Sequence, residues 1–478
     1  MPAISHADYV RHDALGLAEL VRRKEVSAGE LLDAAIARLD AVNPTINAQA
    51  FRFVELAQKQ LAAGVGDGPF AGVPFMTKDL AVMVAGAPLS SGSRAWKDNV
   101  ASVDSVFTER MREAGLVIFG STTSPELGLT PTTENKVQGE THNPWKNGYS
   151  AGGSSGGAAA VVAAGVIPMA QASDGGGSIR TPASACGLFG LKPSRGRVPL
   201  GPLRTEGWNG MSVVGCVSRS VRDSAAFLDA TSGIEPGARY DAPPAPGGGF
   251  LASLDSAPMG LRIALWTRSW ADAEIDAECA EAARATGRLC EQLGHRVEEV
   301  RPPIDGGALA AAFMPLLMTS VAKDIADRGA ARGADVRDDE LEPITAFYRK
   351  RAEEVRGVDI QNALGVQQRA AIQLAHFMAD YDLILSPTQG TPPPKLGVLS
   401  LSNPDFAAYG RDVVAFSPFT ALANHTGQPA MSVPLATSKS GLPIGVMFTA
   451  RYGAEATLLS LAAQLESAQP WKDRLPVL

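Results

Sequence analysis

The sequence predicts an α/β fold, a mixed β-sheet sandwiched between α-helices. Short apolar runs bounded by Gly or Pro alternate with segments of helical periodicity, as in chains that wrap helices around a sheet. The chain has 478 residues, of which 45% are hydrophobic and 19% charged, so it is long enough to bury a large core. Its 49 Gly and 33 Pro indicate many tight turns and exclude fibrous and disordered classes. We expect a single domain over residues 1–478, with a helical insertion at about 305–380.

Charge and cysteine content narrow the functional classes. The net charge is −7 and no basic stripe is present, so a nucleic-acid partner is not expected. The four cysteines share no C-x-x-C spacing, and we expect them to be reduced and mostly buried. The first 13 residues are polar where a signal peptide needs an apolar run, and no stretch reaches about 18 uninterrupted apolar residues. We therefore expect a cytoplasmic protein that does not engage a membrane.

The first half of the chain predicts an amino-terminal helical layer followed by β-α-β alternation. Helical spacing covers residues 15–20 and 31–39, the second run opened by Ser27 and Glu30 as a capping box. The elements expected next are a strand at 73–80, a helix at 102–114, a strand at 116–120, a helix at 157–164, a strand at 166–173 and a helix that opens at Thr181.

Alternation resumes after a Pro- and Gly-rich loop at 234–249. The expected strands lie at 261–266, 296–300, 383–385, 431–434 and 444–448. The expected helices lie at 276–293 and 455–466, and residues 305–380 are predicted to be almost purely helical.

Two runs rich in Gly and Ser are the first candidates for chemistry. Ser154 lies in the run GGSSGG and Ser178 in the run DGGGSIR, 24 residues later. That interval accommodates a loop, a helix, a strand and a second loop, which brings both serines to the same edge of a sheet. Glycines allow close approach of a substrate, and the consecutive N–H groups of Gly175, Gly176 and Gly177 can form an anion-stabilising nest.

A serine hydroxyl near its free pKa is a poor nucleophile, so it needs a base. The six histidines carry no companion motif, whereas Lys78 stands at the end of an apolar segment. Burial of a lysine disfavours its ammonium form and lowers its pKa from about 10.4. In an extended segment the neighbouring Asp79 points to the opposite face. The alternative is an ordinary ion pair between Lys78 and Asp79 or another carboxylate.

The runs FMTKDL, GGSSGG, DGGGSIRTPAS and GLKPSRGR, in this order, closely resemble the signature of the amidase signature hydrolases. The 24-residue spacing of the serines matches as well. The resemblance is strong over a signature core at about 65–230 and extends to the tail through TGQPA, GLPIGV and RYGAEATLL. Residues 235–380 carry no motif of the family.

The resemblance implies the amidase signature fold and a Ser-cisSer-Lys triad that works through an acyl-enzyme without a cofactor. By the resemblance, Ser178 is the nucleophile, Ser154 is the bridging serine and Lys78 is the base. Ser154 relays the proton of Ser178 to a neutral Lys78, and the protonated pair returns it to the leaving amine. Backbone N–H groups of the glycine run and of Ser178 would hold the developing oxyanion.

Three further residues are expected to support the site. The resemblance implies that Ser155 is a local hydrogen-bonding partner and that Asp174 and Arg180 hold the loop. Gly175 departs from the family pattern, since many members carry a side chain there. We expect this departure to loosen the oxyanion loop without removing it.

The same resemblance implies the activity. The runs GLKPSRGR and RSVRDSAAFLD and the tail are most similar to the branch that hydrolyses nylon oligomers. This predicts a serine amidase for the linear or cyclic amide bonds of a small-molecule substrate, and it allows a homodimer. Related branches hydrolyse carbamates, as urethanases do, or aryl acylamides. A different class of function is the glutamine-amidase subunit of a tRNA-dependent amidotransferase, an assembly component that uses the same fold.

Other interpretations have less support. The pattern G-x-S-x-G around Ser154 also matches an α/β-hydrolase elbow, with His295, His376 or His425 downstream, but that elbow needs an apolar strand before it and residues 143–151 are polar. Phosphate-loop, EF-hand and H-E-x-x-H patterns are absent, so no metal is expected. Candidates for an apolar acyl pocket are Trp208, Trp266, Phe313, Met314, Met318, Phe347 and Tyr348.

Overall fold

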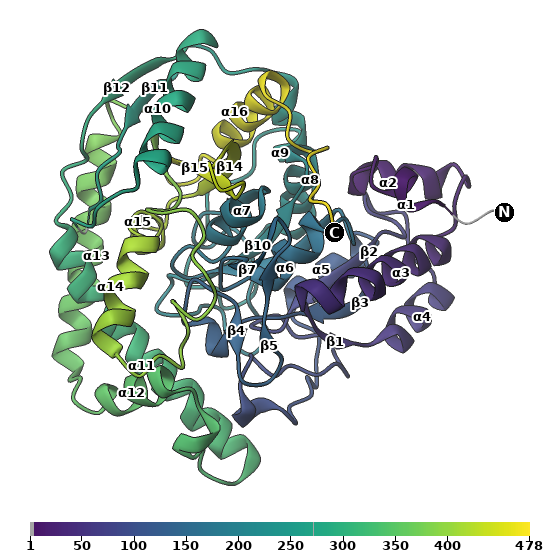
Figure 1. Ribbon diagram of the computed structural model, residues 1–478, viewed down its shortest axis with the longest axis horizontal. Coiled ribbons are helices and arrows are strands. Elements are labelled where there is room, and N and C mark those ends of the chain that lie inside the picture. The colour runs from purple at the N-terminus through teal and green to yellow at the C-terminus, as the bar shows by residue number, and fades with distance from the viewer. Residues whose placement is uncertain (1–3, 271) are drawn as a thin grey trace.

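The computed structural model describes residues 4–270 and 272–478, and its centre is an eight-stranded mixed sheet (Figure 1). The strands in spatial order are β12 (Arg296–Glu299), β11 (Arg262–Leu265), β13 (Leu383–Pro387), β15 (Pro443–Ala450), β14 (Ala430–Thr437), β9 (Phe189–Lys192), β10 (Val213–Ser218) and β8 (Met169–Asp174). β11 is parallel to β12 and to β13, and the other neighbours are antiparallel.

Helices cover both faces of this sheet, as the alternating side chains of two central strands show. Ile263 of β11 and Leu385 of β13 belong to the core on one face, where α10 (Ala277–Gln292) packs. Ala264 and Ile384, each next to one of them in the chain, belong to the core on the other face, with α13 (Gly357–Phe377) and α15 (Ala421–Thr426). Successive side chains of a strand point to opposite faces, so both must be apolar where both faces are covered. The predicted fold class is confirmed.

A three-stranded sheet lies beside β8. Its order is β1 (Gln49–Arg52), β3 (Val117–Thr122) and β2 (Pro74–Lys78), with β2 and β3 parallel. The Lys78 backbone N–H donates to Gln171 Oε1 of β8 at 2.7 Å, which fixes the end of β2 against the large sheet. Four short strands form two hairpins: β4 (Glu134–Asn135) with β5 (Gly139–Glu140), and β6 (His142–Asn143) with β7 (Lys146–Ser150).

Further helices complete the described chain, and several of them were not predicted from the sequence. They are α1 (His6–Tyr9), α2 (Ala14–Arg22), α3 (Ala28–Ile46), α4 (Val54–Ala63), α5 (Val106–Glu113), α6 (Gly156–Ala163), α7 (Arg180–Cys186), α8 (Val221–Thr231), α9 (Gly249–Ala252), α11 (Gly306–Arg332), α12 (Pro343–Ala352), α14 (Phe406–Phe416) and α16 (Glu455–Ala468). The capping box expected at Ser27 and Glu30 is confirmed at the start of α3.

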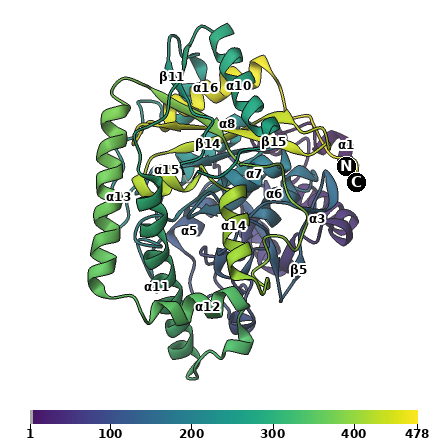
Figure 2. The same cartoon turned by 60° about the vertical axis from the view of Figure 1, so that its left-hand side comes forward.

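The segment expected to be helical at 305–380 contains α11, α12 and α13. Figure 2 shows α11 and α13 side by side, with α12 across their ends and α14 in front. Within the described residues, α11 is the one helix whose length and composition would suffice to cross a bilayer. Buried helices of soluble proteins pass the same test, and α11 packs against α12 and α13.

Several elements differ from the expectation in extent. The strand expected at 166–173 begins at Met169, because Val166 and Ile167 close the turn that follows α6 and Pro168 has no N–H to donate to a ladder. The helix expected at 102–114 begins at Val106, where Ser105 caps it through a bond from the Thr108 amide. Sequence patterns missed α14, β9 and β10.

The polar segment before GGSSGG, where no apolar strand was expected, contains a short polar strand. β7 (Lys146–Ser150) occupies it, pairing with β6 in a hairpin. Main-chain pairing does not require apolar side chains, so this partly buried hairpin forms from a polar sequence. β7 is not part of the eight-stranded sheet, so it does not supply the central strand of an α/β-hydrolase elbow.

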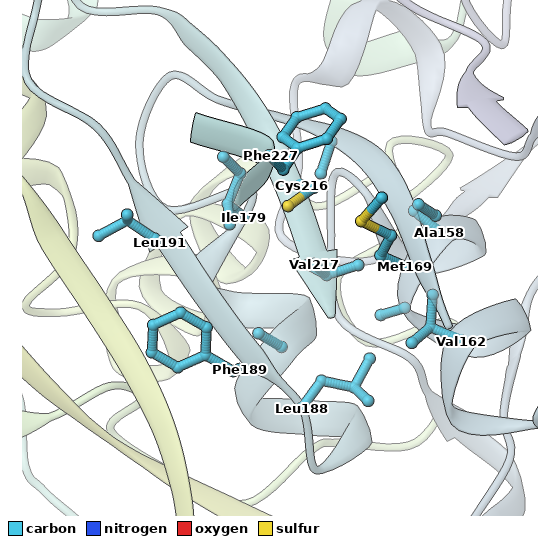
Figure 3. Close-up of a cluster of buried hydrophobic side chains, with 14 of the residues drawn as sticks. Ala158, Val162, Met169, Ile179, Leu188, Phe189, Leu191, Cys216, Val217 and Phe227 are labelled. Atoms are coloured by element: carbon cyan, nitrogen blue, oxygen red, sulfur yellow. The ribbon is translucent and has the colours of Figure 1, made fainter. Parts of the chain in front are cut away.

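Helix α6 is buried along its whole length. Its sequence GGAAAVVA is apolar on every side, which is the pattern of a helix enclosed by protein. Figure 3 shows Ala158 and Val162 of α6 in one buried cluster with Met169 of β8 and Phe189 of β9. The small residues at its amino end let the backbone approach Thr123 closely.

We predict that Gly157→Ala destabilises the fold. A Cβ at this position would lie 2.7 Å from the carbonyl oxygen of Thr123, closer than real Cβ contacts, so the surrounding core must shift. Overpacking of this kind costs about 1–3 kcal/mol. Gly365→Ala in the middle of α13 is the matched control, because its nearest neighbour is the flexible end of Arg369 and the new Ala has higher helix propensity. Urea denaturation should place the midpoint of Gly157→Ala below, and that of Gly365→Ala at or above, the wild-type value.

Candidate active site

Lys78 lies at the end of β2, fully buried, with hydroxyl groups around its amine. Nζ is 2.7 Å from Ser154 Oγ and 3.0 Å from Ser173 Oγ. Burial lowers the pKa of Lys78 to about 7, although the negative charge of Asp174 opposes the shift. Below about pH 7 the amine is therefore mostly protonated, and above it mostly neutral.

Asp79 does not pair with Lys78. The structure therefore does not contain the ion pair that was the alternative for these two neighbours. The Asp79 carboxylate accepts hydrogen bonds from the Ser90 amide and hydroxyl. Burial raises its pKa to about 6, against these hydrogen bonds, which lower it. The extended backbone sends the two side chains to different surroundings, as expected from the strand period of two.

Ser154 is presented by the loop between β7 and α6. The Gly153–Ser154 peptide bond is cis. A Cβ on Gly153 would lie 2.6 Å from the carbonyl carbon of Thr132, so the loop can pack this tightly only with glycine there. Ser155 makes local bonds: its hydroxyl donates to the Ser173 carbonyl at 3.2 Å and accepts from the Ser173 amide at 3.3 Å.

Ser178 follows β8 in the loop that begins at Asp174. Its side chain is half-buried and borders the cavity described below. The Gly177 amide donates to Asp174 Oδ1 at 2.8 Å. Within the described chain, the amides of Gly175 and Gly176 have no acceptor, so they are free to donate to a bound oxygen atom.

Asp174 and Arg180 form a fully buried ion pair beneath this loop. Arg180 Nη2 lies 2.8 Å from Asp174 Oδ1, and Nε donates to Oδ2 at 2.9 Å. Burial alone would raise the pKa of Asp174, but the Arg180 charge outweighs it and lowers the pKa to about 2. Every oxygen of this carboxylate is hydrogen-bonded, which is the condition under which a buried pair is tolerated.

Three residues that sequence patterns did not assign to the site complete the support. Asn424 Nδ2 donates to Asp174 Oδ1 at 2.9 Å, while Thr420 Oγ1 donates to the Gly176 carbonyl at 2.5 Å. Lys192 is buried nearby, where burial and the Arg180 charge lower its pKa to about 7. Asn424 and Thr420 come from α15 and its start, some 240 residues after the loop, so local sequence carries no signal of their contact.

A cavity of about 390 Å³ opens onto Ser178. Its lining residues are Gly128, Leu129, Thr130, Pro131, Gly153, Gly176, Gly177, Ser178, Thr181, Trp208, Trp270, Ala310, Phe313, Met314, Leu317, Ile344, Phe347, Tyr348, Phe406, Tyr409, Gly410, Val413, Val414, Ser417, Pro418 and Ala421. Within the described part of the chain, this lining contains no Asp, Glu, Lys, Arg or His. The cavity therefore suits an uncharged ligand.

The predicted pocket residues divide into two groups. Five line the cavity, and two, Trp266 and Met318, do not. Trp266 is in the core behind α15, with its ring 5.6 Å from that of Phe419. Met318 packs against the cluster around α11 and α12 instead. Apolar patterning places a side chain inside the protein without distinguishing core from pocket.

The histidines considered as bases lie elsewhere. His425 Nδ1 is 3.0 Å from Gln367 Nε2, and burial lowers its pKa to about 4. His295 Nε2 is 2.9 Å from Gln464 Oε1, far along the chain from either serine run. Neither residue borders the cavity at Ser178, so neither serves an elbow at Ser154.

Comparison with known proteins decides the family. The family model described as Amidase matches residues 30–459. The chain belongs to the amidase signature family. It is 39% identical to the 6-aminohexanoate-cyclic-dimer hydrolases of Pseudomonas sp. (strain NK87) and Paenarthrobacter ureafaciens, over 98% of this chain and 96% of each relative. This confirms the resemblance, and the chain is an amidase that acts on C–N amide bonds.

Solved structures agree with this assignment. A structure of 6-aminohexanoate cyclic dimer hydrolase matches with a TM-score of 0.92 and 38% identity, covering 98% of this chain and 99% of that one. A bacterial aryl acylamidase of the amidase signature family matches with a TM-score of 0.85 and 26% identity, covering 96% of both chains. The amidase signature fold is thereby confirmed for nearly the whole chain.

The burial of Lys78 predicts a pH-dependent gain in stability for Lys78→Met. The ordinary pKa of lysine, 10.5, applies in the unfolded state, and the pKa of Lys78 is about 7 in the folded amidase. Between these two pH values the unfolded state binds a proton that the folded state does not. The variant has no amine to deprotonate on folding. The difference in free energy of unfolding between the variant and wild type should therefore increase by about 1.4 kcal/mol for each unit by which the pH is lowered from 10 to 7, and it should stay constant below pH 7.

Urea titrations at pH 6, 7, 8 and 9 measure this difference. Lys192 is present in both proteins, so its own shifted pKa cancels. A difference that does not change with pH would show that Lys78 keeps its ordinary pKa, whatever the offset from lost hydrogen bonds to Ser154 and Ser173.

Proposed function

We propose that this amidase hydrolyses small, uncharged amides through an acyl intermediate on Ser178, with Ser154 and Lys78 transferring the proton. The observation that carries the proposal is the position of Lys78 Nζ, 2.7 Å from Ser154 Oγ in a loop whose Gly153 borders the same cavity as Ser178. A buried amine in contact with hydroxyls and with a pKa of about 7 is a suitable base at neutral pH.

The proposed reaction balances its protons in two steps. Ser178 Oγ attacks the amide carbon, its proton passes to Ser154, and the Ser154 proton passes to neutral Lys78. The cation then returns a proton through Ser154 to the amine as the C–N bond breaks. A water molecule attacks the acyl ester by the same route in reverse, which releases the acid and restores Ser178.

The oxyanion is expected to be held by backbone amides. Gly175, Gly176 and Ser178 offer free N–H groups, and the Gly177 amide is shared with Asp174. The Asp174 carboxylate, paired with Arg180, holds this loop through hydrogen bonds from the Gly177 and Ile179 amides. Preorganised donors of this kind stabilise the charge that develops in the transition state.

The cavity supports a particular class of substrate. An ammonium or carboxylate placed in it would lose its water without gaining a charged partner, which costs several kcal/mol. The cyclic dimer of 6-aminohexanoate has no free ends and so no charge, and we propose it or a related neutral oligoamide as the substrate. The glutamine-amidase alternative is disfavoured because glutamine carries both an amino and a carboxylate group.

Aryl acylamides and aryl carbamates are the second candidate substrates. Aromatic rings line much of the cavity, contributed by Trp208, Trp270, Phe313, Phe347, Tyr348, Phe406 and Tyr409. Ring pairs add about 0.5–1.5 kcal/mol beyond the area that they bury. Among neutral substrates, this lining favours those that carry a flat aromatic group over those that carry a branched aliphatic group.

Substitution of adjacent serines should separate the proposed roles. Ser178→Ala and Ser154→Ala are each expected to lower kcat/KM by at least about 1,000-fold, since each removes a step of proton transfer or bond formation. Ser155→Ala, the matched control one residue away, should keep at least a tenth of the activity because its hydroxyl bonds only to the Ser173 backbone. A fluorophosphonate adduct mapped to Ser178, and lost in Ser178→Ala, checks the nucleophile directly. Equal losses of kcat/KM in Ser154→Ala and Ser155→Ala would contradict the proposed transfer of the proton through Ser154.

We predict that the charge of the substrate has a strong effect on kcat/KM. The cyclic dimer of 6-aminohexanoate is expected to be hydrolysed with a kcat/KM at least about 100-fold above that of the linear dimer, whose charged ends have no partner in the cavity. The N-acetylated methyl ester of the linear dimer, which is neutral, is the matched control and should recover most of the difference. If the charged linear dimer is the better substrate, the uncharged-substrate proposal is wrong even though the serine chemistry stands.

A further inference from the structure

Gly175 is a glycine for reasons of space. Its φ lies outside the left-handed region, in contrast to Gly177 at +138°, so its backbone conformation is open to any residue. A Cβ on Gly175, however, would lie 2.7 Å from both Cε3 and Cζ3 of Trp208. The indole ring occupies the volume that a side chain at 175 would need.

Trp208 is held there by a strained turn. Trp208 and Asn209 have φ of 51° and 53°, a region that bulky residues rarely adopt. The turn is closed by bonds from the Gly210 and Ser212 amides to the Gly207 carbonyl, at 3.1 Å each. Such strain persists only where the surroundings impose it, and it concentrates at functional positions.

The turn is also tied to the oxyanion loop. Asn424 Nδ2 donates to the Met211 carbonyl at 3.1 Å and to the Asp174 carbonyl at 3.1 Å, so one amide holds both segments. Arg195 Nε donates to the Gly210 carbonyl at 2.5 Å. The position of Trp208 relative to the loop is therefore fixed by polar contacts that do not involve the ring itself.

The indole faces the cavity at the loop that carries Ser178. Trp208 is half-buried and lines the cavity together with Gly176 and Ser178. Phe313 borders the same place, with Cζ 3.8 Å from where a Gly176 Cβ would lie. Aromatic rings thus flank the loop at the point where a substrate carbonyl would meet the nucleophile.

We propose that Trp208 is a specificity-determining residue that contacts the acyl group beside the reacting carbonyl, and that Gly175 is small in order to admit it. The inference rests on the proposed function, since it needs Ser178 as the acylated residue. The indole limits the width of the acyl chain next to the carbonyl, so unbranched chains enter and chains branched at that carbon do not. The missing side chain at 175 is then compensated by an indole from another segment.

Acyl p-nitroanilides that differ only at this carbon test the proposal. The two substrates are hexanoyl p-nitroanilide and its 2-ethyl-branched counterpart, and the readout is the ratio of their kcat/KM values. Trp208→Ala should raise the branched-to-straight ratio at least tenfold, whereas Trp208→Phe should give an intermediate value. Trp96→Ala removes an indole that packs against the hydrophobic cluster around α11 and α12 but does not line the cavity. This control variant should leave the ratio unchanged. An unchanged ratio in Trp208→Ala overturns the proposal.

A double-mutant cycle tests the partnership of Gly175 and Trp208. Gly175→Ala should lower kcat/KM on the straight substrate at least tenfold when Trp208 is present, because the new Cβ displaces the indole. In the Trp208→Ala background the same change should cost less than threefold. Equal costs in both backgrounds would show that Gly175 serves the loop alone. Thermal unfolding of each variant verifies that the fold is retained.

Failure of the proposed function is distinguishable from failure of this inference. Labelling rates of Ser178 with a linear and with a branched alkyl fluorophosphonate probe the pocket without amide turnover. If wild type forms no adduct on Ser178, the acyl-enzyme proposal fails and this one falls with it. If wild type is labelled and Trp208→Ala does not change the preference between the two probes, the serine chemistry stands and the role of Trp208 is refuted.

Discussion

The burial of one lysine amine among hydroxyl groups is the constraint on which the site depends. Lys78 Nζ has Ser154 and Ser173 within hydrogen-bond distance, and the adjacent carboxylate of Asp79 is engaged by Ser90. Had a carboxylate paired with the amine, its pKa would rise and it would stay protonated at neutral pH. Desolvation, with no carboxylate hydrogen-bonded to the amine, lowers its pKa to about 7 although the charge of Asp174 opposes the shift. The end of β2, the loop before α6 and the end of β8 all converge to create this enclosure.

A second buried charge network lies beneath the loop that carries Ser178, and in it the carboxylate stays charged. Asp174 keeps its charge because Arg180 and Asn424 saturate it with hydrogen bonds. The resulting carboxylate orders the Gly177 and Ile179 amides and fixes the loop around Ser178. One network thus lowers the pKa of a buried amine, while the other preserves a carboxylate charge that holds a backbone shape. Both are costly in isolation, and tight packing around α6 and α7 supplies the stability that they need.

Chemistry and specificity come from different parts of the chain. The residues proposed for bond cleavage lie within 78–180, on strands and loops buried in the main core. Twelve of the 26 residues that line the cavity lie on α11, α12 and α14, and most of these carry apolar or aromatic side chains. Such a division would allow the pocket wall to vary independently of the residues proposed for bond cleavage, and the relatives are named for different amides, a cyclic dimer and aryl acylamides. In this chain, Gly175 and Trp208 connect the two parts.

The sequence by itself determined the fold class and the approximate positions of most long helices and central strands, because apolar residues repeat with different periods in helices and strands. Two Gly/Ser runs 24 residues apart and Lys78 at the end of an apolar segment indicated the candidate site, and the resemblance to the amidase signature family supplied the roles expected of these residues. Only the tertiary structure decided which distant residues complete the site. Asn424 and Thr420 reach the loop through the packing of α15, and nothing in their local sequence distinguishes them from ordinary core or loop residues. Trp208 was a candidate for the pocket, but only the tertiary structure placed its ring against Gly175. The same holds for the pocket: an apolar side chain at helical spacing is buried either in the core or against a ligand, and only the packing of one helix on another decides which.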